Sequence, residues 1–366
     1  MRNCLHPRLH LLLILLLGVL LVIPGCQFLS ETGLFRESQP TPTMDTSEPS
    51  SDRWYAVYFT EPGGKEATVY EGGPGEAIAL AIDQARISVD VAAYGFNLWD
   101  IRDALLEAHR RGVTVRLLAD DSNIEREEVG ELVEAGISVK GDHGDGLMHN
   151  KFFIIDRLDV WTGSMNPTLG GAYFDNNNML RIRSQQLAEN YSVEFEEMFL
   201  EARFGQASHS DTPYAITSID GTQIETYFSP EDGTARRIVE LIGAAQESVY
   251  FLAYSFTSDD IAAAMIEQAE DGVTVAGVME HGQYKSNTGT EYDRLYAGGV
   301  DVRLDGNPEN MHHKVIVIDE SIVITGSYNF SASAENRNDE NTLIIHSPEI
   351  AARYLEEFKR VYNEGY

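Results

Sequence analysis

The chain has 366 residues, of which 43% are hydrophobic and 23% are charged. This composition is typical of a globular protein of about two domains and excludes a wholly disordered chain. The formal net charge is −31, which excludes a protein that wraps nucleic acid through a basic surface. Both cysteines, Cys4 and Cys26, lie near the N-terminus. The body of the chain therefore has no disulfide framework, zinc–cysteine site or cysteine nucleophile.

Residues 1–25 are predicted to be a signal peptide. Arg2 and Arg8 precede an apolar run over residues 11–23, which is shorter than the roughly 20 residues that span a bilayer. The run ends in Leu21-Val22-Ile23-Pro24-Gly25-Cys26, which resembles a bacterial lipoprotein signal in which Cys26 is acylated. The resemblance implies an exported lipoprotein, anchored to a membrane of the cell envelope. A plain secretory signal and an uncleaved anchor are the alternatives.

Residues 26–53 are predicted to form a flexible linker. They include Gln39-Pro40-Thr41-Pro42-Thr43 and few large apolar residues, so they cannot pack a core. We expect this segment to hold the rest of the protein away from the membrane.

The remainder of the chain contains one sequence unit twice. Ala93-Tyr94-Gly95-Phe96 recurs after 160 residues as Ala253-Tyr254-Ser255-Phe256, and Met148-His149-Asn150-Lys151 recurs after 163 residues as Met311-His312-His313-Lys314. These offsets are far longer than the period of a solenoid repeat, so they indicate duplication of a whole domain.

Each copy is predicted to have an α/β fold. Short segments rich in β-branched residues alternate with segments of helical periodicity, which favours a mixed sheet flanked by helices. We expect two tandem lobes, over residues 54–207 and 223–366. The polar segment 208–222 is the predicted boundary.

The chemistry is predicted to lie where the two copies agree best. Each copy has a histidine, a lysine two residues later and an aspartate five residues after the lysine, followed by Gly-Ser-x-Asn. The members are His149, Lys151, Asp156, Ser164 and Asn166 in the first copy, and His312, Lys314, Asp319, Ser327 and Asn329 in the second. Residues i and i+2 of a strand face the same side. The histidine and lysine of each copy should therefore lie side by side, with Asn150 and His313 turned away.

Such a pair of motifs suits a phosphodiester substrate. One imidazole would attack phosphorus and the other would protonate the leaving oxygen. Lys151, Lys314, Asn166 and Asn329, with the hydroxyls of Ser164 and Ser327 as further substrate contacts, would hold the non-bridging oxygens as charge builds. This chemistry needs no metal or other cofactor. Asp156 and Asp319 are expected to stabilise the turns that follow the motif strands.

The doubled motif resembles the phospholipase D superfamily, over residues 54–366. The resemblance implies two α/β lobes related by a pseudo-twofold axis, one active site at their interface, and a phosphohistidine intermediate. It also implies a monomer, since both motifs lie in one chain. Residues 326–341 look most like the small bacterial endonucleases and the cardiolipin-hydrolase-like members. In those, a glutamate eleven residues after the motif asparagine supports a catalytic histidine; here this is Glu340, whereas the first copy has Asn177.

The roles of the two histidines are predicted from the same resemblance. The first motif usually supplies the nucleophile, which assigns attack to His149 and leaving-group protonation to His312. A nearby carboxylate raises the pKa of an imidazole. If Glu340 contacts His312 of its own lobe, His312 would be the protonated acid, in agreement with this assignment. If Glu340 reaches His149 instead, that argument reverses.

Four functions remain open from the sequence. A phospholipase D-type phosphodiesterase that acts on phospholipid fits a membrane-anchored protein, and a non-specific endonuclease of the same superfamily is the main alternative. A catalytically inactive binding protein is a third possibility. A metallohydrolase with ligands from His143, His149, His281 and His312 is the fourth.

Overall fold

The structure is a computed structural model that describes residues 53–366, apart from Asp145. The predicted signal peptide, its acylated Cys26 and all but the last residue of the predicted linker lie outside the described residues. Within residues 53–366, again without Asp145, no helix is both long and apolar enough to cross a membrane.

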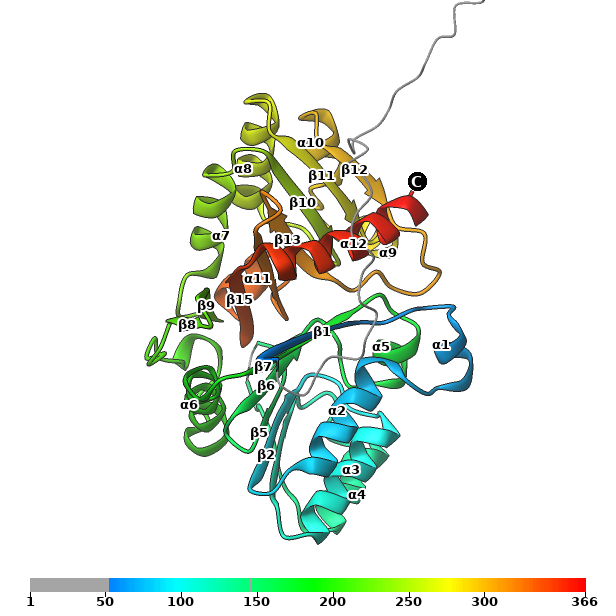
Figure 1. Ribbon diagram of the computed structural model, residues 1–366, viewed down its shortest axis with the longest axis vertical. Helices are drawn as coiled ribbons and strands as arrows, with labels where there is room; N and C mark the ends of the chain where they lie inside the picture. Colours follow the sequence, from blue (N-terminus) through cyan, green and yellow to red (C-terminus); the bar gives the residue numbers. More distant parts are fainter. Residues whose placement is uncertain (1–52, 145) are drawn as a thin grey trace, which may run out of the picture. The chain divides into compact units, whose positions relative to one another are not determined.

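The first lobe is a seven-stranded sheet with helices on its faces (Figure 1). In spatial order the strands are β1 (Tyr55–Phe59), β7 (Asn178–Arg183), β6 (Asp159–Gly163), β5 (Lys151–Ile155), β2 (Ser88–Ala93), β3 (Thr114–Ala119) and β4 (Ser138–Gly141). The helices are α1 (Lys65–Val69), α2 (Gly73–Gln84), α3 (Trp99–Arg110), α4 (Glu127–Glu134), α5 (Leu169–Tyr173) and α6 (Gln185–Glu201), and a 3₁₀ turn, Gly205–Ala207, follows them.

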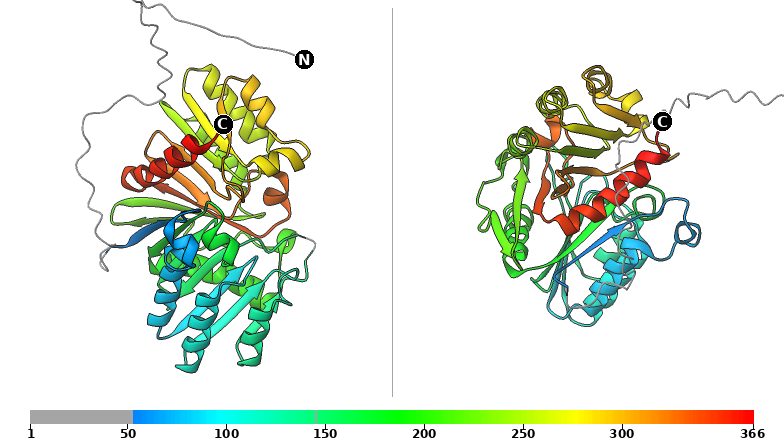
Figure 2. Two further views of the ribbon diagram at one scale, coloured as in Figure 1. Left: turned by 90° about the vertical axis from the view of Figure 1, so that its right-hand side faces the viewer. Right: turned by 45° about the horizontal axis from the view of Figure 1, so that its top comes forward.

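The second lobe is an eight-stranded sheet, shown from two further sides in Figure 2. Its strands in spatial order are β12 (Asp301–Leu304), β11 (Thr274–Met279), β10 (Ser248–Ala253), β13 (Lys314–Ile318), β14 (Ile322–Gly326), β15 (Glu340–His346), β9 (Thr222–Ser229) and β8 (Ile216–Ile219). Its helices are α7 (Thr234–Gly243), α8 (Asp259–Glu270), α9 (His281–Ser286), α10 (Tyr292–Ala297), α11 (Ala332–Asn336) and α12 (Pro348–Glu364).

The two sheets share one topology. In the first, β2 pairs parallel with β3 and antiparallel with β5, and β5, β6, β7 and β1 continue antiparallel. The second sheet repeats this pattern from β10 to β9. The predicted duplication into two mixed α/β sheets is therefore confirmed, and the two lobes form one compact unit.

The boundary between the lobes differs from the prediction in one respect. The polar segment 208–222 contains β8, which pairs antiparallel with β9 and extends the second sheet. The exposed side chain of Ile216 and its polar neighbours hide this strand in the sequence, because an edge strand buries few side chains.

The motif strands lie at the centre of each sheet. All residues of β2, β5, β10 and β13 are buried, because helices cover both faces of the sheets there. Each motif strand continues through a tight turn into its neighbour, β6 or β14. The last residue of β6 or β14 then packs closely against the next strand, β7 or β15. A Cβ at Gly163 would lie 2.3 Å from the backbone oxygen of Asn178, and one at Gly326 would lie 2.1 Å from that of Asn341. Only glycine permits this approach.

Candidate active site

Backbone hydrogen bonds join each motif to the opposite lobe. The amide of His149 donates to the carbonyl of Asp339 at 3.0 Å, and the amide of His312 donates to the carbonyl of Asn176 at 2.9 Å. Each motif histidine therefore lies beside the strand that follows the Gly-Ser-x-Asn segment of the other lobe, β15 or β7.

His149 pairs with Glu340 across the lobe boundary. Its Nδ1 lies 2.9 and 2.8 Å from the two carboxylate oxygens of Glu340, and both side chains are buried. Glu340 also accepts from Ser327 Oγ at 2.6 Å and from Asn338 Nδ2 at 3.3 Å. The carboxylate is thus held by three donors and directs Nε2 of His149 away from itself.

His312 has a neutral partner, Asn177. The distance from His312 Nδ1 to Asn177 Oδ1 is 2.9 Å. Asn177 Nδ2 donates to the carbonyl of Gly171 at 2.9 Å and Ser164 Oγ donates to Asn177 Oδ1 at 2.8 Å. These contacts orient the amide, so its oxygen faces the imidazole and His312 carries its proton on Nδ1.

Of the two contacts left open for Glu340, the structure has the one that crosses to His149 and not the one with His312 of its own lobe. Asp339 pairs with Met148 in a parallel bridge, and its amide donates to the carbonyl of Leu147 at 2.9 Å. This pairing brings the next residue, Glu340, to His149. The corresponding bridge between Asn176 and Met311 brings Asn177 to His312.

The predicted role of Ser164 and Ser327 as substrate contacts also needs correction. Both side chains are fully buried. Each hydroxyl donates to the side chain that holds the opposite lobe's histidine and accepts from the backbone amide of the next residue, Asn178 or Asn341, at 3.1 or 3.0 Å. With these partners satisfied inside the protein, the serines orient Asn177 and Glu340 and do not face substrate.

The lysines lie beside the histidines, as the strand alternation predicts. Lys151 Nζ donates to the carbonyl of His149, and Lys314 Nζ donates to that of His312 at 2.7 Å. Tyr94 contacts the first pair: its ring lies 5.1 Å from the ring of His149 and 5.4 Å from Lys151 Nζ.

Tyr254 contacts the second pair in the same way. Its ring lies 4.5 Å from that of His312 and 4.8 Å from Lys314 Nζ. Sequence reasoning did not single out these tyrosines as site residues, although their recurrence at one place in each repeat was a signal for them. The tyrosines are only half-buried.

Burial and mutual repulsion shift the titration of the four basic groups. Burial lowers the pKa of His149 below its usual value although Glu340 opposes the shift. Burial, followed by the charges of Lys314 and Lys151, lowers the pKa of His312 further. Burial lowers the pKa of Lys151 to about 7, and burial with the charge of Lys151 lowers that of Lys314. These shifts agree with the geometry, in which His149 contacts Glu340 and His312 contacts Asn177 across the lobe boundary, so the two motifs lie in one place.

Asn166 and Asn329 are the remaining motif residues near this site. Their amide oxygens are buried and, among the described residues, have no hydrogen-bond partner. A buried polar atom without a partner is costly. An amide oxygen accepts hydrogen bonds, so these two atoms call for a donor. The predicted contact with the phosphoryl oxygens would use the Nδ2 groups of the same side chains, and it stays a prediction.

Asp156 and Asp319 lie away from the histidines. The carboxylate of Asp156 accepts from the backbone amides of Arg86, Ile87 and Ser88, and that of Asp319 accepts from the amides of Gln246, Glu247 and Ser248. Each aspartate ties its turn to the start of the neighbouring strand, β2 or β10, as predicted.

The four histidines proposed as metal ligands do not form one donor set. His143 pairs with Asp121 at 2.8 Å on the exposed surface, and the ring of His281 lies against Tyr366. Over residues 53–366 without Asp145, no three histidine, cysteine or acidic side chains are placed to hold a metal ion.

Known proteins share this sequence pattern and fold. The model of the family described as "Cardiolipin synthase, PLD-like domain" matches residues 78–199 and 238–362. A phospholipase D of Rickettsia bellii (strain RML369-C) is 35% identical over 153 residues, which cover 41% of this chain and 76% of that protein. The mitochondrial cardiolipin hydrolase of Chlamydomonas reinhardtii is 24% identical over 188 residues, which cover 45% of this chain and 84% of that protein.

A solved structure resembles nearly the whole described chain. The crystal structure of the phosphatidylserine synthase of Haemophilus influenzae Rd KW20 matches with a TM-score of 0.64 and 13% identity, and the match covers 85% of this chain and 86% of that one. At this identity the likeness concerns the fold alone. The two segments that match the family cover more than half of the chain, one in each lobe, and each contains one histidine–lysine motif. The chain therefore belongs to the phospholipase D superfamily, and it is a phosphodiester hydrolase.

Proposed function

We propose that the enzyme hydrolyses phosphodiester bonds of a phospholipid, such as a phosphatidyl lipid or cardiolipin, through a phosphohistidine intermediate. The crossed pairing of the two histidines carries this proposal. Nδ1 of His149 is occupied by Glu340 and Nδ1 of His312 by Asn177. Nε2 is then the atom that each ring offers to a substrate between the lobes.

In the proposed mechanism, Nε2 of His149 attacks phosphorus. Ground-state protonation alone would favour the opposite assignment, because Glu340 favours a charged His149. The rate, however, depends on interactions that strengthen in the transition state. The attacking imidazole keeps its Nδ1 proton, so it gains positive charge as the N–P bond forms. The carboxylate of Glu340 stabilises that charge, so it supports His149 as the nucleophile.

His312 is the proposed general acid. An acid changes from the charged to the neutral form as it gives up its proton, so a carboxylate partner would oppose the transfer. Asn177 orients the ring without adding charge. The bound phosphodiester anion favours the protonated form of His312 before reaction. Its Nε2 proton then passes to the leaving oxygen as the P–O bond breaks.

The second step reverses these roles. Neutral His312 takes a proton from water, the water oxygen attacks phosphorus, and the P–N bond to His149 breaks. Lys151, Lys314, Asn166 and Asn329 hold the non-bridging oxygens in both steps. The protein thus supplies the positive charge that this mechanism requires, without a metal.

Three observations support a lipid substrate. Proteins named phospholipase D from Rickettsia are 34–36% identical to parts of this chain. Leu147, two residues before His149, has an exposed fraction of 39%, so an apolar side chain lies next to the first motif. The net charge of −31 opposes the approach of a polyanion such as nucleic acid; it also opposes approach to an anionic lipid surface, so it supports an uncharged lipid surface best.

Turnover of phosphatidyl lipid vesicles and of single-stranded DNA, measured side by side with EDTA present, tests the substrate. We expect lipid hydrolysis that EDTA leaves unchanged. Cleavage of DNA without lipid hydrolysis would identify the alternative, a non-specific endonuclease. Loss of activity in EDTA would contradict the metal-free mechanism.

We also propose that the enzyme is a bacterial cell-envelope lipoprotein acylated at Cys26. The apolar run and the cysteine that follows it motivate this proposal. Mass spectrometry of the N-terminal peptide from membranes should find a lipid-modified Cys26. Cys26→Ser should release an enzyme that remains active. An unmodified Cys26, or a mature chain that starts elsewhere, would exclude this anchor.

A further inference from the structure

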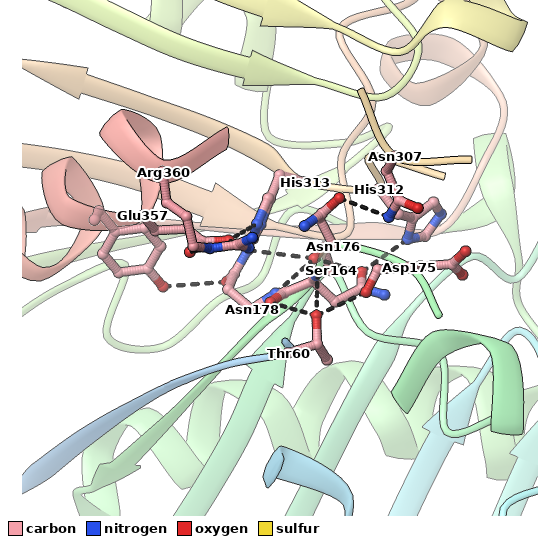
Figure 3. A network of polar contacts seen from close by, with 12 residues as sticks. Thr60, Ser164, Asp175, Asn176, Asn178, Asn307, His312, His313, Glu357 and Arg360 are labelled. Atoms are coloured by element: carbon pink, nitrogen blue, oxygen red, sulfur yellow. Dashed lines mark hydrogen bonds and ion pairs between the residues drawn. The ribbon is translucent and has the colours of Figure 1, made fainter. Parts of the chain in front are cut away.

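A buried charged unit lies behind the second motif. His313 is fully buried, and its Nε2 lies 2.9 Å from Oε1 of Glu357 on α12. Arg360, one turn further along α12, donates to both oxygens of the same carboxylate at 2.9 and 2.6 Å. Figure 3 shows this unit beside Asn178 of the first lobe. The mechanism above uses none of these three side chains.

A chain of hydrogen bonds connects His313 to His312 by way of the first lobe. Nδ1 of His313 lies 3.1 Å from Asn178 Nδ2, which also donates to Ser164 Oγ at 3.3 Å. Ser164 Oγ donates to Asn177 Oδ1 at 2.8 Å, and Asn177 Oδ1 accepts from His312 Nδ1 at 2.9 Å. Every member of the chain is buried.

Only one arrangement of donors satisfies this chain. The carbonyl oxygen of Asn178 accepts from Thr325 Oγ1 at 2.9 Å and from Tyr354 Oη at 3.1 Å, so the amide nitrogen must face His313. Nδ1 of His313 is then the acceptor, and its single proton lies on Nε2, where Glu357 accepts it. Burial lowers the pKa of His313, which favours this neutral form.

A corresponding chain of hydrogen bonds leads to His149 by way of the second lobe, but its end groups differ. Asn341 Nδ2 donates to Asn150 Oδ1 at 2.7 Å and to Ser327 Oγ at 3.4 Å, and Ser327 donates to Glu340, the partner of His149. In this chain the carboxylate of Glu340 contacts His149, and the other end of the chain is the neutral amide of Asn150. In the chain to His312 the catalytic histidine has a neutral amide, and the carboxylate, Glu357, lies at the far end.

We propose that His313 is a positioning residue for His312, which acts by holding the amide of Asn178 in the one orientation that lets Ser164 donate to Asn177. This inference rests on the catalytic role of His312 proposed above. Glu357 and Arg360 fix the tautomer of His313, so the C-terminal helix sets the orientation of a catalytic ring through five side chains. Without an acceptor at Nδ1 of His313, Asn178 Nδ2 loses a buried partner while Thr325 and Tyr354 still hold the amide oxygen. The side chain of Asn178 then shifts to relieve the unpaired donor, and the ring of His312 loses its fixed direction.

Three substitutions of His313 separate this role from a purely structural one. The side-chain oxygen of His313→Asn lies near the position of Nδ1 and can accept from Asn178, as Asn150 accepts from Asn341. His313→Gln reaches Glu357 but offers no acceptor at the Nδ1 position, and His313→Leu offers neither. We expect kcat of the Asn variant to stay within about threefold of wild type, and kcat of the Gln and Leu variants to fall by roughly 10–100-fold. KM should change by less than about twofold in all three, because His313 does not touch substrate.

The rates are measured on whichever of lipid and single-stranded DNA the wild-type enzyme cleaves, so a wrong substrate assignment does not affect the outcome. His346 provides a matched control, since it pairs with Glu225 at 2.8 Å and Glu225 pairs with Arg237 at 2.8 Å, at the far end of β15. His346→Leu should lower thermal stability without lowering kcat. Wild-type kcat in a folded His313→Gln variant would overturn the proposal, and so would an Asn variant as slow as the Gln variant. If His313→Leu does not fold, the Asn and Gln pair decides.

Discussion

Glu340 of the second lobe holds His149 of the first, with 2.8 Å between Oε2 and Nδ1. The corresponding residue of the first lobe, Asn177, holds His312 at 2.9 Å. The site is therefore symmetric in shape and asymmetric in charge. In the proposed mechanism, His149 gains positive charge beside a buried carboxylate, and His312 loses positive charge beside a neutral amide.

The contribution of the Glu340 charge to kcat should be the same for a poor and for a good leaving group. Glu340→Gln keeps a hydrogen-bonding side chain of the same size, and we expect kcat to fall by about 10²–10³-fold. The loss should be similar for a phospholipid and for a p-nitrophenyl phosphodiester, because His149 gains the same charge in both. If Glu340 served only to keep His149 protonated as the acid, the activated ester would escape most of the loss.

The two histidines should respond differently to an activated leaving group. His149→Ala and His312→Ala should each reduce lipid turnover by at least about 10²–10⁴-fold. Since p-nitrophenolate leaves with little protonation, the His312→Ala variant should regain part of its activity on that ester, and His149→Ala should not. Rescue of His149→Ala alone would show that the assigned roles are reversed.

The sequence predicted the members of this site better than their contacts. The repeated motif identified His149, Lys151, His312 and Lys314, because strand alternation alone places a histidine beside a lysine two residues later. It could not predict that Glu340 crosses to His149. That contact depends on how the lobes dock, through the bridge between Met148 and Asp339, and no local pattern within one repeat encodes it.

The contacts of the two motif serines could not be predicted from the sequence either. Ser164 and Ser327 share the motif with Asn166 and Asn329, so their type and spacing suggested substrate contacts. The close approach at Gly163 and Gly326 instead turns each hydroxyl onto the following strand. The side chain to which each hydroxyl donates is 13 residues further along the chain, and its position is set by the register of that strand.

Lys151 should be useful for catalysis and harmful to stability. Its ammonium is fully buried, and burial lowers its pKa from 10.5 to about 7. Between about pH 7 and pH 10.5 the unfolded chain binds more protons at this lysine than the folded one does. The contribution of Lys151 to the free energy of unfolding therefore rises with pH across that window, and it is least favourable below about pH 7.

Lys151→Met should abolish activity and stabilise the free enzyme by about 1–4 kcal/mol at pH 6, because it replaces a buried charge by an apolar side chain of similar length. The gain should shrink towards pH 9. Urea unfolding at both pH values measures it. A variant that is less stable than wild type at pH 6 would show that the ammonium is well compensated in the folded state.

The motif aspartates should affect stability and leave the chemistry unchanged. The carboxylate of Asp156 accepts from three consecutive backbone amides, at distances from 2.7 to 3.2 Å. Asp319 does the same at distances from 2.7 to 3.1 Å. Both residues have a positive φ, of 54° and 48°. Asparagine tolerates this backbone conformation, so Asp156→Asn and Asp319→Asn remove the charge without adding strain.

Each of these two substitutions should lower the free energy of unfolding by roughly 1.5–3 kcal/mol, the usual contribution of hydrogen bonds to a charged group. Urea titration gives that value, and kcat per folded molecule should equal that of the wild type. The two losses should add, because the turns lie in different lobes and share no partner. A fall in kcat at unchanged stability would instead show that the aspartate takes part in catalysis. Its carboxylate would then have to reach the histidines in a conformation in which it no longer binds the backbone amides.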